Sequence, residues 1–386
     1  MKIDKEKWEL VKLEDICHIN IGKTPSRNNK LNFGNGYTWL SISDFTGEKY
    51  LFKSKEEITE IALKEANHKI IQTNTILLTF KLTIGKLAIS GKPLFTNEAI
   101  ASLPIKSFDK IGIEYLFTVL QTVDYHSKTD KAVKGATLNK EKLKSLPIPL
   151  PPVEEQQQIA SLFQSIETAI EQLAAEAEKL KTLKITLVNG LFSEVPIFGN
   201  LLSHDNCKRM NFGELADCDK KQPEHEKEVS RFVGLENIEA ENFQLNGWGE
   251  ISDGTTFSKR FSKGDVLFGK RRAYLKKVAI ADFDGICSGD ILVLRAKREK
   301  LLQGLLPYYI SADAFIQYAV STSAGSLSPR TKWKDLAELE ITLPDLETQP
   351  KILEVFNQLE LTTSHLKQQK TTLQQLKQKL LNDILG

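Results

Sequence analysis

A chain of 386 residues is longer than one ordinary hydrophobic core supports, so two or more domains are expected. Hydrophobic residues make up 41% and charged residues 26%, as in globular proteins, and no run of ~18 apolar residues predicts a membrane span. A net charge of +2 excludes neither nucleic acid nor protein as a partner, and four scattered cysteines favour a reduced cytoplasmic location over a disulfide framework.

Residues 1–150 are predicted to form a first mixed α/β domain. Within it, residues 76–91 (ILLTFKLTIGKLAISG) are β-rich and interrupted by glycine, which predicts a pair of strands. The domain ends in residues 146–152 (LPIPLPP), whose prolines favour extended backbone and then the start of a helix.

A long helix is predicted within residues 151–196, because apolar residues recur there every seven positions. Gly190 and Pro196 close it. Two rows of apolar residues, which we call the first and second seams, run along the helix. The first seam consists of Ile159, Ile166, Leu173, Leu180 and Leu187, and the second seam is partly filled by Leu162, Phe163, Ala169, Ile170 and Leu183. Five heptads of this kind predict a coiled-coil stripe.

A second α/β domain (197–343) and a second long helix (344–386) repeat this order. Residues 339–352 (LEITLPDLETQPKI) align without a gap with residues 146–159 (LPIPLPPVEEQQQI) at a constant offset of 193. The second helix repeats the first seam as Ile352, Leu359, Leu366, Leu373 and Leu380, and its second seam holds Val355, Phe356, Leu376 and Ile384. The globular parts correspond more weakly: 39–45 with 232–238, 76–91 with 266–282, and 135–148 with 325–341.

Two long helices with the same apolar stripe are expected to pair antiparallel if the chain goes out along one and returns along the other. A helix of about 38 residues is about 57 Å long at ~1.5 Å per residue. On duplex DNA this length corresponds to roughly 17 base pairs at ~3.4 Å each. Two diverged domains on such a spacer predict a split, asymmetric target, provided that the chain binds DNA.

The whole chain resembles the specificity subunits of Type I restriction–modification enzymes. The resemblance is carried by WELVKLEDICHINIGKTPSR at the start, YTWLSISDF, TNEAI and the strand pair at 76–91. It is carried most specifically by GATLNKEKLKSLPIPLPPVEEQQQIASLF and its second copy near the C-terminus. That copy reads EITLPDLETQPKI, with fewer prolines before the helix and an extra one at Pro350.

This resemblance implies an α+β fold with two target recognition domains, alternating with two helices that form an antiparallel coiled coil around a pseudo-twofold axis. Each domain would read one half of a bipartite site on double-stranded DNA. The helices would set the spacer and bind two methyltransferase subunits, which restriction–translocase subunits would join. S-adenosylmethionine, ATP and Mg would belong to these partners, and this chain would bind no cofactor or metal and catalyse nothing.

Motifs for catalysis are not found in the sequence. Gly22-Lys23-Thr24 resembles the end of a phosphate loop, but the required earlier glycine is replaced by Cys17. Cys17 and His18 are neighbours, and adjacent strand residues point to opposite faces, which argues against a shared metal. Asp282, Asp284 and Asp290 lack the partners of a nuclease motif and are expected in turns.

The strongest candidate for DNA contact is the basic segment 259–277 (KRFSKGDVLFGKRRAYLKK). Arginine can donate two hydrogen bonds to guanine or bind phosphate, and lysine binds phosphate. The alternative is that the segment is a hairpin whose charged side chains only face solvent. The candidates in the second domain are Lys259, Arg260, Lys270, Arg271, Arg272, Tyr274 and Lys276, together with Ser326, Ser328 and Arg330 of the loop 325–330.

The first domain offers a polar loop, the corresponding strand pair and a glycine-hinged loop at 135–139. Small polar residues suit approach to the DNA backbone, although a turn before a short helix explains them equally well. The candidates are Lys23, Thr24, Ser26, Arg27, Lys81, Lys86, Lys134, Thr137 and Asn139.

Several apolar residues lie off the seams of the helices: Leu191, Phe192, Leu353, Leu361, Leu381 and Leu385. They fit either partner helices or contacts with the chain's own globular domains. The main alternative function is a coiled-coil scaffold whose globular domains bind protein. A detached module of a larger enzyme and a transcription regulator are further alternatives, and the sequence shows no helix-turn-helix or basic zipper.

Overall fold

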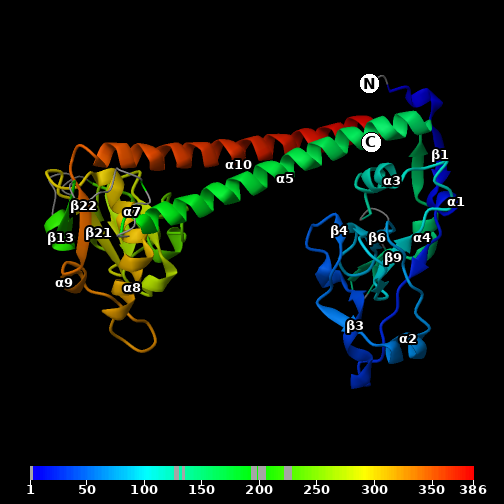
Figure 1. Cartoon of the computed structure of the whole chain (residues 1–386), viewed down its shortest axis with the longest axis horizontal. Coiled ribbons are helices and arrows are strands. Elements are labelled where there is room, and N and C mark those ends of the chain that lie inside the picture. The colour runs from blue at the N-terminus through cyan, green and yellow to red at the C-terminus, as the bar shows by residue number, and fades with distance from the viewer. Residues whose placement is uncertain (1–2, 126–129, 133–134, 193–197, 199–205, 221–227) are drawn as a thin grey trace. The chain divides into compact units, whose positions relative to one another are not determined.

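The computed structural model describes residues 3–125, 130–132, 135–192, 198, 206–220 and 228–386, and the chain divides into two units. Unit 1 comprises Met1–Leu173 and Gln369–Gly386, and unit 2 comprises Ala174–Gln368. Each unit contains one mixed α/β domain and part of both long helices, α5 (Val153–Gly190) and α10 (Gln349–Leu385) (Figure 1). The predicted order of domain, helix, domain and helix is confirmed.

Unit 1 is built on two β-sheets. The larger has the order β2–β9–β6–β7–β4, with β2 (Asn20–Ile21), β9 (Ile100–Leu103), β6 (Ile76–Thr79), β7 (Leu87–Ser90) and β4 (Tyr50–Leu51). The smaller is β5 (Glu56–Ile58), β3 (Phe33–Leu40) and β8 (Phe95–Thr96). Two separate antiparallel pairs join β1 (Glu9–Lys12) to β12 (Pro147–Leu150) and β10 (Asp130–Ala132) to β11 (Gly135–Thr137). The helices are α1 (Leu13–Ile16), α2 (Glu60–Ala66), α3 (Ile113–Leu120) and α4 (Lys140–Lys144), with 3₁₀ turns at Lys5–Lys7, Lys30–Asn32 and Ile42–Asp44.

Unit 2 contains two four-stranded sheets. One is β14 (Ala216–Cys218), β21 (Ile291–Ala296), β18 (Val266–Gly269) and β19 (Val278–Ile280). The other is β16 (Gly249–Glu250), β15 (Arg231–Val233), β20 (Gly285–Cys287) and β17 (Lys259–Phe261). β13 (Cys207–Asn211) pairs with β22 (Glu340–Pro344). The helices are α6 (Phe212–Leu215), α7 (Leu306–Ser311), α8 (Asp313–Ser321) and α9 (Trp333–Leu336), with 3₁₀ turns at Leu235–Asn237, Ile251–Asp253, Ala273–Leu275 and Gln303–Leu305.

The two domains share a scaffold, as the weak sequence correspondence predicted. In unit 1, Trp39 of β3 lies beside Phe95 of β8 in a parallel pair, and Phe232 of β15 lies beside Ile286 of β20 in the same way. The segments 76–91 and 266–282 both form antiparallel strand pairs, β6–β7 and β18–β19.

The core of each unit includes the ends of the long helices. In unit 1, Phe163 of α5 and Leu381 of α10 are buried with Leu78 of β6 and Leu116 of α3, which lies between the helices and the larger sheet (Figure 1). In unit 2, the rings of Tyr308 and Phe356 stack with centroids 4.0 Å apart, within the largest cluster of buried residues. The helices are therefore held by the domains as well as by each other.

Reciprocal ion pairs join the two helices, which pack antiparallel. In unit 1, Lys377 of α10 donates to Glu167 of α5 over 2.7 Å, and in unit 2, Lys184 of α5 pairs with Glu360 of α10. The offset of 193 converts Glu167 into Glu360 and Lys184 into Lys377. Each copy of the repeat therefore supplies the acid of one pair and the base of the other.

All ten residues of the first predicted seam are buried or half-buried. The second seam is only partly correct. Phe163 and Phe356 are buried, but Leu183 and Leu376 are each 44% exposed. Leu183 and Leu376 are equivalent at the offset of 193, so the same position is exposed on both helices.

A buried glutamine at the same place in each repeat ties the start of a long helix to its domain. The Gln156 Nε2 donates to the carbonyls of Lys110 and Pro151, both at 2.9 Å, and its Oε1 accepts from the Gly112 N–H at 3.2 Å. Gln349, its equivalent at +193, donates to the carbonyls of Lys300 (2.8 Å) and Pro344 (2.9 Å) and accepts from the Leu302 N–H (2.8 Å). Every polar atom of both amides is engaged, as burial requires.

Glu167 also fastens the first domain to the helices. Its carboxylate accepts a hydrogen bond from Lys49 at 2.9 Å, and Lys49 forms a second ion pair with Glu114 at 2.7 Å. Burial alone would raise the pKa of Glu167, but the hydrogen bonds from Lys377 and Lys49 outweigh it and hold this pKa below its usual value.

Most of the off-seam apolar residues contact the chain's own domains. Leu191, Phe192 and Leu353 belong to the core of unit 2, Leu381 and Leu385 belong to the core of unit 1, and Leu361 is 51% exposed.

Candidate nucleic-acid interface

The basic connection between β18 and β19 in unit 2 is a tight turn rather than a flat hairpin face. Arg272 and Lys276 both adopt left-handed backbone, with φ of 54° and 50°, on either side of the 3₁₀ turn Ala273–Leu275. Ala273 is buried beneath the turn.

A second loop lies against this turn. Ala324 and Arg330 exchange two backbone hydrogen bonds, of 3.1 and 3.0 Å, and so close a hairpin. The Arg272 N–H donates to the Pro329 carbonyl (2.8 Å), and the Thr331 N–H donates to the Lys270 carbonyl (3.1 Å). The structure therefore places the basic segment 259–277 and the loop 325–330 in contact, which the sequence had predicted as separate candidates. In Figure 1 the hairpin is the orange loop that follows α8.

Asp290 holds this cluster together. Its carboxylate accepts from the Arg330 Nε (2.6 Å) and Nη2 (3.1 Å) and forms an ion pair with the Arg271 Nη1 (3.2 Å). Its backbone carbonyl accepts from the Lys270 N–H at 2.9 Å. The hydrogen bonds from Arg330 lower the pKa of Asp290, so the carboxylate is charged at neutral pH. Arg271 and Arg330 thus share the Asp290 carboxylate, Lys270 lies close enough to act on its charge, and Arg272 binds the adjoining hairpin through the Leu327 and Pro329 carbonyls. We call Lys270, Arg271, Arg272 and Arg330 the basic cluster.

Other candidates of the second domain have internal partners. Lys259 donates to the Asp219 carboxylate and to the Ile291 carbonyl, each at 2.7 Å, and Lys276 pairs with Asp313. Arg260 also has an interaction partner. Tyr274 is 52% exposed, and both serines of the hairpin lie beside the basic cluster, Ser326 exposed and Ser328 half-buried.

The polar loop of the first domain is mostly tied to its own domain. The Arg27 guanidinium donates to both oxygens of Glu56 at 2.7 Å and lies over the rings of Phe33 (4.3 Å) and Trp39 (5.6 Å). Thr24 donates to Glu98, and the Lys23 Nζ donates to the Asn67 carbonyl at 3.3 Å. Ser26 is exposed, and its carbonyl accepts from the Asn32 side chain at 3.1 Å.

Two further candidates of the first domain, Lys81 and Lys86, lie in the connection between β6 and β7. The Lys86 Nζ donates to the Phe45 carbonyl (3.0 Å), and the Lys81 Nζ lies 5.4 Å from the Phe80 ring. Asn139 caps α4 by accepting from the Lys142 N–H at 2.8 Å. Lys134 and the side chain of Thr137 lie outside the described part of the chain. The Leu138 N–H donates to the Phe80 carbonyl at 3.0 Å, which matches the Thr331–Lys270 bond of unit 2.

Two features of the site escaped sequence reasoning. Asp290 was expected in a turn, and its role as the partner of two arginines gives no local signal because Arg330 lies 40 residues away. Arg231 was not considered, yet its guanidinium lies over the rings of Trp248 (4.3 Å) and Phe283 (5.2 Å).

The described residues contain no group of three or more histidines, cysteines or acids that could hold a metal ion. Burial raises the pKa of Cys17, Cys218 and Cys287 to about 12, so these thiols are protonated at neutral pH. Within the same part of the chain, no helix is both long and apolar enough to cross a membrane.

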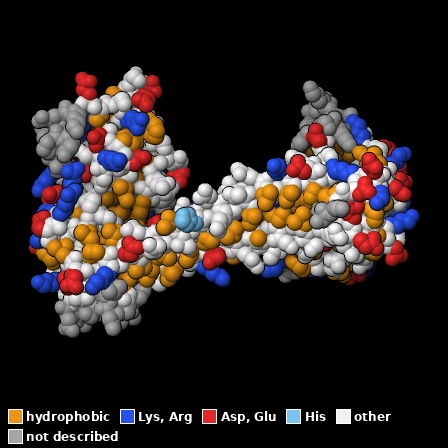
Figure 2. All heavy atoms as spheres, turned by 90° about the horizontal axis from the view of Figure 1, so that it is seen from above, with side chains coloured by type: hydrophobic (Ala, Val, Ile, Leu, Met, Phe, Trp, Pro, Cys, Tyr) orange, Lys and Arg blue, Asp and Glu red, His pale blue; other side chains and the backbone are white. Residues whose placement is uncertain are grey.

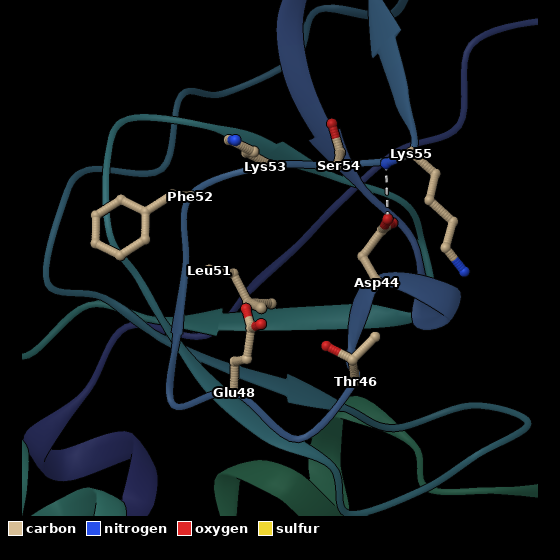
Figure 3. A pocket seen from close by; sticks show the side chains of 8 residues that line it. All are labelled: Asp44, Thr46, Glu48, Leu51, Phe52, Lys53, Ser54 and Lys55. Atoms are coloured by element: carbon tan, nitrogen blue, oxygen red, sulfur yellow. Dashed lines mark hydrogen bonds between the residues drawn. The ribbon is translucent and has the colours of Figure 1, made fainter. Parts of the chain in front are cut away.

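A hollow of about 400 Å³ lies in unit 1, lined by Asp44, Thr46, Glu48, Leu51, Phe52, Lys53, Ser54 and Lys55 (Figure 3). The Asp44 carboxylate points at the Lys55 backbone and accepts its N–H at 2.8 Å, while the Phe52 ring extends away from the other side chains (Figure 3). Asp44 also accepts from the Ser41 N–H at 2.7 Å. Its carboxylate therefore serves to close the loop rather than to bind a ligand.

Hydrophobic side chains also form a band along α5 and α10 on the face shown in Figure 2. Leu183, Ile185, Leu361 and Leu376 are each more than a third exposed on these helices. This band differs from the basic cluster in chemistry and suits a protein partner rather than nucleic acid.

Comparison with known proteins gives a consistent result. The family model for the Type I restriction modification DNA specificity domain matches twice, at residues 5–182 and 207–377. The Type I restriction enzyme MjaIX specificity subunit of Methanocaldococcus jannaschii is 32% identical over 204 residues, which covers 52% of this chain and 46% of that protein. The MjaVIII specificity subunit of the same organism is 23% identical and covers 98% of this chain and 92% of its own length. The crystal structure of a Type I S subunit from M. genitalium has the same fold, with a TM-score of 0.57 at 14% identity over 100% of this chain and 98% of that one.

Proposed function

The chain belongs to the Type I restriction–modification DNA specificity family, as a non-catalytic specificity subunit, and we propose that its two domains each read one half of a split DNA site. The recognition domains would be residues 1–150 and 197–343, on the spacer helices 151–196 and 344–386. The main support for this proposal is that the two copies of the repeat agree in one part and differ in another. The contacts between helix and domain recur at an offset of 193, as in Gln156 and Gln349, whereas the candidate DNA-contacting surfaces of the two domains differ.

The basic cluster supports DNA contact in the second domain. Four basic side chains in two adjoining segments, of which only Arg271 and Arg330 are paired with Asp290, provide a local positive potential that a net charge of +2 conceals. Arg271 and Arg330 are oriented by Asp290 yet stay 42% and 46% exposed, so their remaining N–H groups are available to phosphate or to guanine.

The helices carry the proposed spacing and assembly. α5 is continuous over 38 residues, about 57 Å at ~1.5 Å per residue, which corresponds to roughly 17 base pairs between the halves of the site. The hydrophobic band along α5 and α10 suits two methyltransferase subunits, and restriction–translocase subunits would join them. S-adenosylmethionine, ATP and Mg would then be bound by those partner subunits rather than by this chain.

The direct test removes charge from the basic cluster by K270Q, R271Q and R272Q and measures binding of the assembled complex to its methylation site. We expect each lost phosphate contact to reduce the slope of log affinity against log salt by about 1. We also expect protection of the second half-site to be lost first. K351Q, which neutralises an exposed lysine on α10, is the matched control.

Equal loss of protection at both half-sites would contradict the two-reader proposal. A complex without salt-dependent DNA affinity would favour the scaffold alternative. Assembly is tested separately by co-purification, where we expect two methyltransferase subunits for each copy of this chain.

A further inference from the structure

Leu327 lies between the two serines of the hairpin closed by Ala324 and Arg330, and its side chain is 88% exposed. In the described part of the chain, no other large hydrophobic residue is as exposed. Single exposed leucines are common on protein surfaces and need no explanation by themselves. The surroundings of Leu327 set it apart.

The backbone on both sides of Leu327 is fixed. The Arg272 Nη2 donates to the Leu327 carbonyl at 3.3 Å, and the Arg272 N–H donates to the Pro329 carbonyl at 2.8 Å. Gly325 supplies the turn with a φ of 111°, which favours glycine, and Pro329 restricts the other side. The backbone that carries the leucine is therefore ordered before binding, and little backbone conformational entropy remains to be lost when the side chain is buried.

The polar neighbours of Leu327 are small or positively charged. Ser326 and Ser328 flank it and leave its side chain unshielded. Arg330 lies three residues further on and donates to the Ser328 carbonyl at 3.3 Å, and Arg272 contacts the Leu327 carbonyl itself. A single apolar side chain beside two arginines differs from a typical protein-binding patch, in which apolar residues are contiguous and charged residues lie at the rim.

We propose that Leu327 inserts between two stacked base pairs of the second half-site and locally bends the DNA. This inference rests on the proposed function, because it requires the second domain to bind duplex DNA. Leucine is among the apolar side chains that DNA-bending proteins insert between base steps. The basic cluster would hold the flanking phosphates while the leucine occupies the opened step. The deformability of that step would then add to sequence selection.

The first domain repeats the framework but places its leucine elsewhere. The Leu138–Phe80 hydrogen bond is equivalent to the Thr331–Lys270 bond, and Leu82 has left-handed backbone, with φ of 63°, in the connection where unit 2 has Arg272. Leu82 is 72% exposed. The effect of Leu327 should therefore be confined to one half-site, which makes the opposite half-site an internal control.

The experiment uses the full chain in its methyltransferase complex and duplexes that carry 2-aminopurine at successive positions of the second half-site. We expect the fluorescence to rise at one step with the unaltered complex, because unstacking relieves quenching. L327A should abolish this rise and weaken binding roughly 10-fold, since it removes most of the buried apolar surface of the side chain. L327F should retain the rise, because a bulky apolar side chain still separates the bases.

L346A is the matched control, since Leu346 is another exposed leucine of unit 2, 46% exposed, between β22 and α10. It should behave as the unaltered chain does. A persistent fluorescence rise with L327A would overturn the insertion even if DNA binding is intact. Loss of methyltransferase subunits from L327A with unchanged fluorescence would identify a protein contact instead and would also overturn it. Absence of specific DNA binding by the unaltered complex would refute the proposed function and the insertion together.

Discussion

Replacement of Gln156 by methionine tests whether the repeated glutamine couples each domain to its helix. Methionine has nearly the same length as glutamine and no amide. The Q156M variant therefore keeps the volume but loses three hydrogen bonds, to the carbonyls of Lys110 and Pro151 and from the N–H of Gly112. The amide is 2% exposed, so water cannot readily replace these bonds.

The expected loss follows from the number of buried groups left without a partner. Each unsatisfied buried group costs about 1–3 kcal/mol, so three such groups at the lower limit give about 3 kcal/mol in the free energy of unfolding. With a urea slope of about 2 kcal/mol per molar, this loss lowers the midpoint of unit 1 by about 1.5 M. The repeat predicts a loss of the same size in unit 2 for Q349M, whose amide has the equivalent three partners.

The assay is urea unfolding followed by tryptophan fluorescence and circular dichroism, fitted with separate transitions for the two units if the probes do not coincide. Q157M is the control, because Gln157 is exposed one position further along the same helix. Its effect should stay within about 0.5 kcal/mol. Equal effects of Q156M and Q157M, or a loss below about 1 kcal/mol for both Q156M and Q349M, would refute the reasoning.

Three further predictions concern charged groups. K184E should destabilise unit 2 by placing two carboxylates together, and adding E360K should restore about 1 kcal/mol as a coupling energy in a double-mutant cycle; strict additivity would show that the pair is unimportant. D290A should weaken DNA binding several-fold by releasing Arg330, although it removes a negative charge, and tighter binding would contradict the orienting role of Asp290. Since the pKa of Glu167 is lowered despite its burial, its stabilisation is complete above the unfolded value of about 4.5 and is lost as pH falls through the lower folded value. The stability difference between the unaltered chain and E167Q should therefore shrink below pH 4.5 in urea titrations, and a constant difference would disprove this assignment.

Sequence periodicity was sufficient to predict the large-scale organisation. The heptads of 151–196 predicted a helix that the structure places at Val153–Gly190, and the offset of 193 predicted the second copy at Gln349–Leu385. These features are local or strictly repeated, so a single sequence contains them. The second seam was wrong at Leu183 and Leu376, because heptad spacing alone does not say which of the neighbouring apolar residues faces the partner helix.

The environment of single charged residues was beyond sequence reasoning. Arg27 was chosen from a polar loop and Lys259 from the basic segment 259–277, but Glu56 and Asp219, which lie 29 and 40 residues away, are their partners. Only the tertiary fold brings such carboxylates close. Asp290 shows the same effect in reverse, because a residue expected merely in a turn orients two arginines of the basic cluster. Which candidate residues touch DNA stays a prediction.

The most direct test of the central claim is a methylome comparison between cells with and without the gene for this chain. The account predicts that one methylated motif disappears with the gene. That motif should be split into two different specific blocks separated by a spacer of fixed length, because two diverged domains are joined by helices of constant length. An unchanged methylome, or the loss of a single uninterrupted motif, would contradict it.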